Sequence, residues 1–243
     1  MKLVTSMLRK SLLKVWSDGA RLNNDYLISY IEHTKTAKIL DIGCDTGELV
    51  IERVRNIDNP NIYGIDIEQK AVIAARKRGL RVVKADVEKG LPFPSNSFDI
   101  VSANQIIEHL VEVDFFIEEI HRVLKPDGYL VLATENLSSW HNILALILGW
   151  QDFSHYMSKK KNIGNPLRID TSNSRPKSTM HIKIFTLRSL KELLELYNFR
   201  VEKFFGTGYY PFAGRISRIL SKLDPTHCAF IGLKARKLVK SNK

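Results

Sequence analysis

Residues 39–49, "ILDIGCDTGEL", lead from an apolar run into a turn that holds two acids and two glycines. "AKILDIG" has the composition of a strand buried on both faces, and "GELVIERVRNI" repeats its apolar residues at helical spacing. Gly43 and Gly47 would let the backbone approach a ligand closely, and the helix that follows offers free N–H groups. The stretch therefore predicts a ligand-binding turn between a first strand and a first helix.

The alternation of strand and helix continues along the chain. Further strands are predicted at 61–67, 80–87, 97–104 and 129–136, with helices at 69–79 and 114–124. After an irregular stretch, a helix is predicted at 186–199 and strands at 200–208 and 227–237, whose short separation permits antiparallel pairing. Strands that alternate with helices favour a parallel sheet with right-handed crossovers.

The organisation predicted is one domain over residues 1–243. Its parts are a helical N-terminal cap (1–36), an alternating core that binds the cofactor (37–136), a lid insertion (137–180) and the C-terminal part of the sheet (181–243). The insertion is too long for an ordinary connection and is followed by renewed alternation, which favours a lid over the active site.

Composition narrows the class of protein. The two cysteines, Cys44 and Cys228, form neither a disulfide framework nor a zinc spacing. The N-terminus lacks the apolar core of a signal peptide, and "ILALILGW" at 143–150 is too short to span a membrane, so a cytoplasmic protein is predicted. The net charge of +11 indicates either an anionic partner or only a well-solvated surface.

Acidic residues follow successive predicted strands. Asp66 ends the second strand, about twenty residues beyond the glycine turn, where a carboxylate can accept both hydroxyls of a ribose. Asp86 ends the third strand, where it could accept the adenine amino group. The glycine spacing is G-x-x-x-G and not the G-x-G-x-x-G of a pyrophosphate site. With the acids of the opening turn, Asp66 and Asp86 place acids at the ends of three successive strands. This arrangement suits a cationic, phosphate-free adenosine ligand, and S-adenosylmethionine is such a ligand.

The chain resembles the class I S-adenosylmethionine-dependent methyltransferases. "ILDIGCDTG", "GIDIEQKAV", "ADVEKGLPFPSNSFDIV", "EHL" and "HRVLKPDGYLVLATEN" carry the resemblance over about residues 37–136. It implies an α/β fold: a Rossmann-like, doubly wound, mostly parallel sheet of seven strands with the last antiparallel, plus N-terminal helices and the lid. It also implies cofactor-binding roles for Asp41, Gly43, Asp45, Gly47, Asp66, Ile67, Asp86, Val87 and Asn104.

These implied roles divide the cofactor among the strand ends. Asp41, Gly43, Gly47 and Asn104 would lie at its methionine portion, Asp66 at the ribose, and Asp86 with Val87 at the adenine. Asp45 stands where the family's D-x-G-x-G-x-G has its middle glycine. Aspartate is among the few residues that tolerate left-handed backbone, so the turn can persist.

The segment "QIIEHL" places Glu108 and His109 just beyond the fourth strand. His109 is the candidate general base for an oxygen nucleophile, with Glu108 beside it, and His181 is a candidate substrate-binding residue. The segment resembles two metal-assisted groups, the ubiquinone-biosynthesis O-methyltransferases and the small-RNA 2′-O-methyltransferases. Both have a glutamate where this chain has Gln105. Since a hard anionic ligand is missing, no metal is predicted and activity should persist in EDTA.

Two aromatic-rich segments, 138–157 and 204–214, either wall the acceptor pocket, with Trp140 and Tyr209 as candidates, or pack against each other. The predicted function is methylation, first of all O-methylation, of a small-molecule or lipid-linked acceptor. An RNA 2′-O-methyltransferase and a non-catalytic S-adenosylmethionine-binding protein are the alternatives. Peripheral membrane contact and the oligomeric state are left open.

Overall fold

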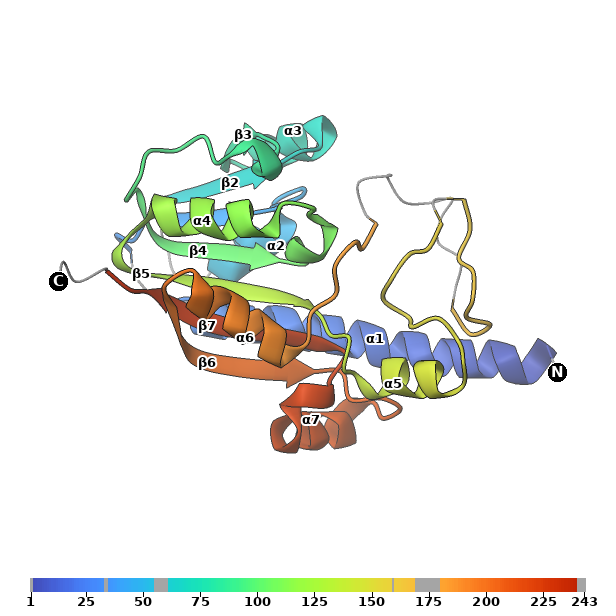
Figure 1. Cartoon of the computed structure of the whole chain (residues 1–243). Helices are drawn as coiled ribbons and strands as arrows, with labels where there is room; N and C mark the ends of the chain where they lie inside the picture. The colour runs from blue at the N-terminus through green and yellow to red at the C-terminus, as the bar shows by residue number, and fades with distance from the viewer. Residues whose placement is uncertain (1, 33–34, 55–60, 159, 169–179, 240–243) are drawn as a thin grey trace.

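A computed structural model describes residues 2–32, 35–54, 61–158, 160–168 and 180–239. Its sheet has seven strands in the order β3-β2-β1-β4-β5-β7-β6 (Figure 1). The strands are β1 Ile39–Ile42, β2 Ile62–Asp66, β3 Arg81–Lys84, β4 Phe98–Asn104, β5 Leu124–Glu135, β6 Phe199–Thr207 and β7 Phe230–Lys237. Strands β1 to β5 pair in parallel, and β7 runs antiparallel to both β5 and β6. The predicted fold class is confirmed.

Helices cover both faces of this sheet. They are α1 Lys2–Tyr30, α2 Glu48–Val54, α3 Gln69–Lys77, α4 Val113–Val123, α5 Trp140–Ile147, α6 Leu187–Leu196 and α7 Gly214–Leu223. In Figure 1, α4 and α6 lie in front of the sheet, and the long α1 crosses behind it. The ring of Tyr26 on α1 stacks on Phe205 of β6 with centroids 4.8 Å apart. No helix among the described residues combines the length and apolar character needed to cross a membrane.

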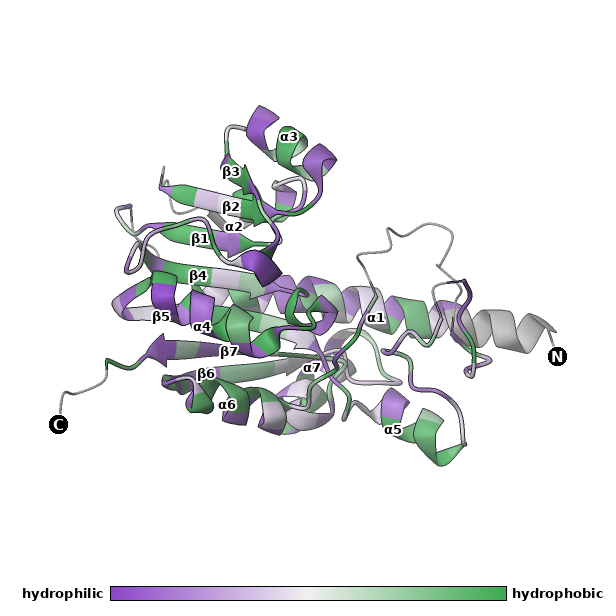
Figure 2. Ribbon diagram, turned by 45° about the horizontal axis from the view of Figure 1, so that its top comes forward, coloured by the Kyte–Doolittle hydropathy of each residue, from purple (hydrophilic) through white to green (hydrophobic). Residues whose placement is uncertain are grey.

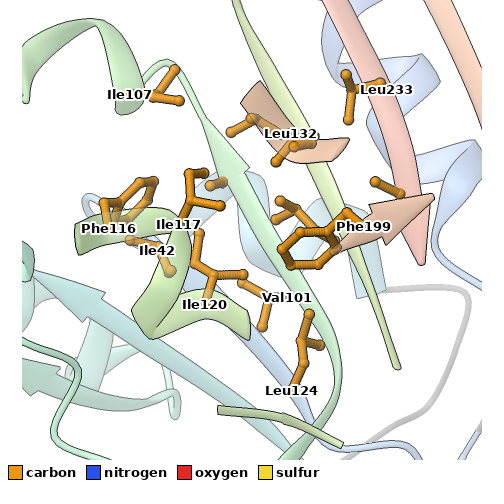
Figure 3. Packing of buried hydrophobic residues seen from close by; sticks show 14 of the residues in the cluster. Ile42, Val101, Ile107, Phe116, Ile117, Ile120, Leu124, Leu132, Phe199 and Leu233 are labelled. Carbon is orange, nitrogen blue, oxygen red and sulfur yellow. The ribbon is translucent and has the colours of Figure 1, made fainter. Parts of the chain in front are cut away.

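The front layer of the core holds the segment that carries His109. On α4, the apolar residues Phe116, Ile117 and Ile120 recur at helical spacing and are fully buried (Figure 3). Burial of each such side chain contributes about 1.5–3 kcal/mol. Ile107, also fully buried in this cluster, belongs to a short 3₁₀ turn, Ile107–His109. The turn that carries His109 is thus held in place by the burial of Ile107 in the core.

Several local predictions are confirmed and others need correction. The helix predicted from residue 186 is present as α6, and Thr186 is its N-cap: the Thr186 hydroxyl accepts a hydrogen bond from the Ser189 amide at 3.1 Å. The N-terminal cap contains one long helix, not several. The predicted aromatic segments contain α5, and α7 lies between β6 and β7 where no helix was predicted. Part of the predicted lid, residues 159 and 169–179, lies outside the described residues.

Candidate active site

The turn after β1 depends on three residues with positive φ. Gly43 has φ 71°, Asp45 has φ 46° and Gly47 has φ 80°, so Asp45 does adopt the left-handed backbone expected of it. A Cβ at Gly43 would lie 2.1 Å from Cδ1 of Ile106, and one at Gly47 would lie 2.4 Å from Cδ1 of Leu80. Gly43 therefore lets the turn approach the end of β4, while Gly47 lets it pack beside α3.

The Asp66 carboxylate ties this turn to the end of β2. The Asp45 amide donates to Oδ2 at 2.8 Å, and the Glu68 amide donates to Oδ1 at 2.9 Å. An ionised carboxylate has about four acceptor positions, so each oxygen keeps capacity for another donor. Asp66 is therefore held in a fixed orientation and can still accept two hydroxyl groups.

A cavity of about 550 Å³ opens beyond the carboxyl ends of β1, β2 and β4. The predicted cofactor residues that line it are Gly43, Asp45, Asp66, Ile67, Asp86, Val87 and Asn104, and His109 lines it too. Asp41 and Gly47 are not in this lining. Asp41 is buried within β1, between Gly64 of β2 and Ser102 of β4, and Gly47 faces the packing beneath the turn.

Helix α1 holds one of the residues that line this cavity, a contact that the sequence did not predict. Asn23 donates its side-chain amide to Oδ1 of Asn104 at 2.8 Å, and Asn104 donates to Oδ1 of Asn24 at 2.9 Å. Asn104 lines the cavity, so α1 fixes the orientation of a predicted cofactor residue. No local pattern in the sequence connects this asparagine pair with the end of β4.

A pair of histidines joins this cavity to a second one. His181 lines a cavity of about 160 Å³, and its ring centroid lies 4.8 Å from that of His109. Nδ1 of His109 lies 3.1 Å from the Met180 carbonyl oxygen, and Nδ1 of His181 lies 2.9 Å from that of Ser154. A carbonyl can only accept, so each Nδ1 carries the proton, and Nε2 of a neutral ring remains an acceptor.

Two carboxylates surround His181. Glu108 is fully buried; Thr134 donates to its Oε2 at 2.8 Å, while its Oε1 has no hydrogen-bond partner among the described residues. Burial raises the pKa of Glu108 to about 7. Burial alone would lower the pKa of His181, but the hydrogen bond and charge of Glu135, 3.4 Å away, and the charge of Glu108 raise it. His181 therefore favours its charged form between the two acids.

Comparisons with known proteins agree with this geometry. Residues 40–132 match the family described as "Methyltransferase domain". The chain is 30% identical over 170 residues to a demethylmenaquinone methyltransferase of Lactobacillus johnsonii, covering 66% of this chain and 67% of that protein. The chain belongs to the class I S-adenosylmethionine-dependent methyltransferases. S-adenosylmethionine is accordingly its cofactor.

Two further matches of this methyltransferase are shorter. It is 33% identical over 127 residues to a ubiquinone biosynthesis O-methyltransferase of Bartonella bacilliformis, which covers 50% of each chain. The chain thus spans about half the length of that relative, and it spans 45% of the length of an uncharacterized methyltransferase of Schizosaccharomyces pombe.

Solved structures share the fold at low sequence identity. A methyltransferase from Mesorhizobium loti superimposes with a TM-score of 0.60 at 19% identity, covering 88% of this chain and 96% of that one. A [4+2]-cyclase superimposes with a TM-score of 0.58 at 22% identity, covering 90% of this chain and 81% of that one.

The second cavity of the methyltransferase is largely aromatic and aliphatic. The predicted aromatic segments supply Phe153, Tyr156 and Tyr210, and unpredicted walls come from Leu12, Leu13 and Trp16 of α1 and from Phe230 of β7. Trp140 and Tyr209 are not in either lining. Trp140 Nε1 donates to the Tyr209 hydroxyl at 2.7 Å, which in turn donates to Asp224 at 2.9 Å. Their role in acceptor binding stays a prediction.

Glu108, His109 and His181 also fit a divalent cation by the kind of ligand they offer. One potential ligand atom from each lies within 4.8 Å of the others. Two imidazoles and one carboxylate form a donor set that iron and similar metals accept. The absence of a metal, predicted from Gln105, therefore stays a prediction that needs its own test.

The titration of Glu108 should be visible in the stability of the metal-free protein. Its pKa is raised from 4.5 to about 7, so the stability that its protonated form contributes is lost as pH rises through 7. His181, with a raised pKa, has the same sign. Between pH 5 and 8 the Tm of the wild type should fall relative to that of Glu108→Gln, in thermal unfolding with EDTA present. The exposed Glu118→Gln is the control, and parallel curves for wild type and Glu108→Gln would contradict the expectation.

Proposed function

We propose that this methyltransferase methylates an oxygen of a small-molecule or lipid-linked acceptor bound in the second cavity. The observation that carries the proposal is the histidine pair. His109 lines the cofactor cavity, His181 lines the second cavity, and their rings are 4.8 Å apart. An acceptor hydroxyl at the junction would meet the cofactor on one side and an imidazole on the other.

His109 is the proton acceptor in this proposal. Its Nδ1–H is held by the Met180 carbonyl, so Nε2 can take the hydroxyl proton as the oxygen attacks. S-adenosylmethionine, when bound, supplies the methyl group: the oxygen–carbon bond forms, the sulfur–carbon bond breaks and S-adenosylhomocysteine leaves. In its protonated form, which Glu135 and Glu108 favour, His181 would position the acceptor oxygen by donating to it. Positioning of this kind supplies a large part of the rate in group transfer.

The side chains that line the second cavity favour an apolar acceptor rather than a nucleotide. Leu12, Trp16, Phe153, Tyr210 and Phe230 present mostly carbon to the interior. The guanidinium of Arg168, in the cavity wall, lies 3.9 Å over the Tyr156 ring and donates to the carbonyl oxygen of His155. The relative named a ubiquinone biosynthesis O-methyltransferase is consistent with an apolar, hydroxyl-bearing acceptor.

Release of S-adenosylhomocysteine, measured against a panel of acceptors, tests this proposal. We expect turnover with apolar phenols or quinols and with lipid-linked hydroxyl compounds, and none with RNA. Salt-sensitive RNA binding with methylation of a ribose hydroxyl would support the nucleic-acid alternative instead. Tight cofactor binding without turnover on any acceptor class would support the binding-protein alternative.

Chelation tests the role of metal. Protonated His181 can itself compensate the buried acids, and an imidazolium cannot bind a metal. Gln105 also replaces an acid of the metal-assisted groups. We therefore expect methyl transfer to persist after EDTA treatment, measured as S-adenosylhomocysteine release. Loss of activity that Mn²⁺ or Mg²⁺ restores would show instead that Glu108, His109 and His181 hold an ion.

A further inference from the structure

Helix α7 exposes its apolar side chains and buries its small polar ones. Ile216, Ile219 and Leu223 are 57%, 60% and 77% exposed, while Ser217 and Ser221 are 4% and 7% exposed. With about 3.6 residues per turn, the three aliphatic residues share one side of the helix. The usual surface helix places its apolar side toward the core. The outward side of α7 is therefore suited to contact with something other than water.

Helix α5 repeats this arrangement. Asn142 and Ala145 are buried, whereas Leu144, Ile147 and Leu148 are exposed, Ile147 by 75%. Figure 2 colours much of α5 as hydrophobic. Asn142 explains the orientation: its amide donates to the Asn136 carbonyl at 3.0 Å and its oxygen accepts from the Phe153 amide at 2.8 Å. These polar contacts hold the aliphatic side outward.

The two helices lie on the same side of the molecule, at the lower edge in Figure 1. Hydrogen bonds connect them: Trp140, the first residue of α5, bonds to the Tyr209 hydroxyl, and the Tyr209 amide donates to the Ser217 hydroxyl of α7 at 2.9 Å. We call six exposed aliphatic residues together the apolar surface: Leu144 and Ile147 of α5, Leu148 at its C-terminal end, and Ile216, Ile219 and Leu223 of α7.

Cations flank the apolar surface along α7. Arg215, Arg218 and Lys222 are exposed, and α7 contains no acidic residue. Within the described part of the chain, none of the three cations has an acidic partner within salt-bridge distance. Asp224, at the end of the helix, is hydrogen-bonded to His227 and to the Tyr209 hydroxyl. An apolar stripe with cations beside it is typical of helices that lie in a membrane interface.

We propose that α5 and α7 dock this methyltransferase on an anionic lipid bilayer. The aliphatic side chains would enter the boundary between headgroups and acyl chains, and Arg215, Arg218 and Lys222 would meet the lipid phosphates. A symmetric contact between two copies would bring the cations of both chains together, which disfavours self-association. Binding to RNA would use the cations but leave the aliphatic side chains in water.

The docked orientation would also serve the second cavity. His141 of α5 and Tyr210, just before α7, both line that cavity, so the two helices join its wall to the membrane. Resting on the proposed function, this inference narrows the acceptor to a lipid-dissolved molecule that reaches the cavity from the bilayer.

Co-sedimentation with vesicles tests the docking without any acceptor. We expect the full chain to bind vesicles of phosphatidylglycerol and phosphatidylcholine and to bind pure phosphatidylcholine at least about tenfold more weakly. Ile219→Ser with Leu223→Ser should weaken binding to the mixed vesicles by about tenfold or more. Arg215→Gln with Arg218→Gln should weaken it comparably and reduce its salt dependence. Leu196→Ser, at an equally exposed residue at the end of α6, is the matched control.

Each result has a defined meaning. Unchanged affinity for S-adenosylhomocysteine would show that the variants are folded. Failure of the wild type to bind mixed vesicles, or equal binding by the double variants, would overturn the docking. So would dimerisation in analytical ultracentrifugation that Ile219→Ser with Leu223→Ser abolishes, because the apolar surface would then join two copies. Vesicle binding without turnover on any hydroxyl acceptor would leave the docking intact and overturn only the proposed function.

Discussion

Replacing His109 with asparagine should lower kcat by about 10²–10⁴-fold, the usual contribution of a general base. The asparagine amide can take the place of Nδ1–H and donate to the Met180 carbonyl, so the local structure has a substitute for the lost hydrogen bond. It offers no basic nitrogen at the position of Nε2. Affinity for S-adenosylhomocysteine, measured by calorimetry, should stay within about threefold, because the group removed acts on the acceptor.

Substitution of a second histidine outside the two cavities is the control for this experiment, because it shows the effect of a histidine-to-asparagine change on structure alone. His121, on α4, packs edge-on against Phe199 with centroids 5.3 Å apart and lines neither of the two cavities. His121→Asn should therefore leave kcat close to that of the wild type. If His109→Asn turns over as fast as His121→Asn, His109 only packs the junction between the cavities, and the proton must leave by another route.

Much of the fold and half of the site could be predicted because their determinants are local. Strands β1, β2 and β4 are short, mostly apolar runs separated by turn residues, and the period of α4 is visible in Phe116, Ile117 and Ile120. In a parallel sheet the carboxyl ends of the strands meet at one edge. The acids after β2 and β3 could thus be placed in one cavity without knowledge of their contacts.

The remaining features depend on contacts between distant segments. Asn23 meets Asn104 across 81 positions, and no periodicity relates them. His181 reaches His109 only because the chain returns to the sheet after the insertion, where the Ile182 amide donates to the Glu108 carbonyl at 2.7 Å. Helix α7 has aliphatic residues at helical spacing, but they face outward. Its apolar pattern therefore does not indicate how the helix packs against the sheet.

Asp66 is the cofactor residue whose loss should cost the most affinity. Asp66→Ala should weaken S-adenosylhomocysteine binding by about 1.5–3 kcal/mol, roughly 10- to 150-fold, because it removes hydrogen bonds to a charged group. The Asp45 amide would also lose its acceptor, so part of this loss would come through the turn. Asp66→Asn keeps one acceptor oxygen and should fall between the alanine variant and the wild type. The exposed Asp114→Ala, which loses its bond from the Tyr197 hydroxyl far from the cavity, should bind as the wild type does.

A cofactor analogue without ribose hydroxyls divides the loss between ligand contact and turn geometry. Such an analogue cannot use the free acceptor positions of Asp66, so contact with the hydroxyls predicts that Asp66→Ala binds it nearly as well as the wild type does. The difference between the two ligands is then the coupling energy between the carboxylate and the hydroxyls. An equal loss for both ligands would assign Asp66 to holding the Asp45 turn in place. An unchanged dissociation constant for S-adenosylhomocysteine would remove it from the cofactor site altogether.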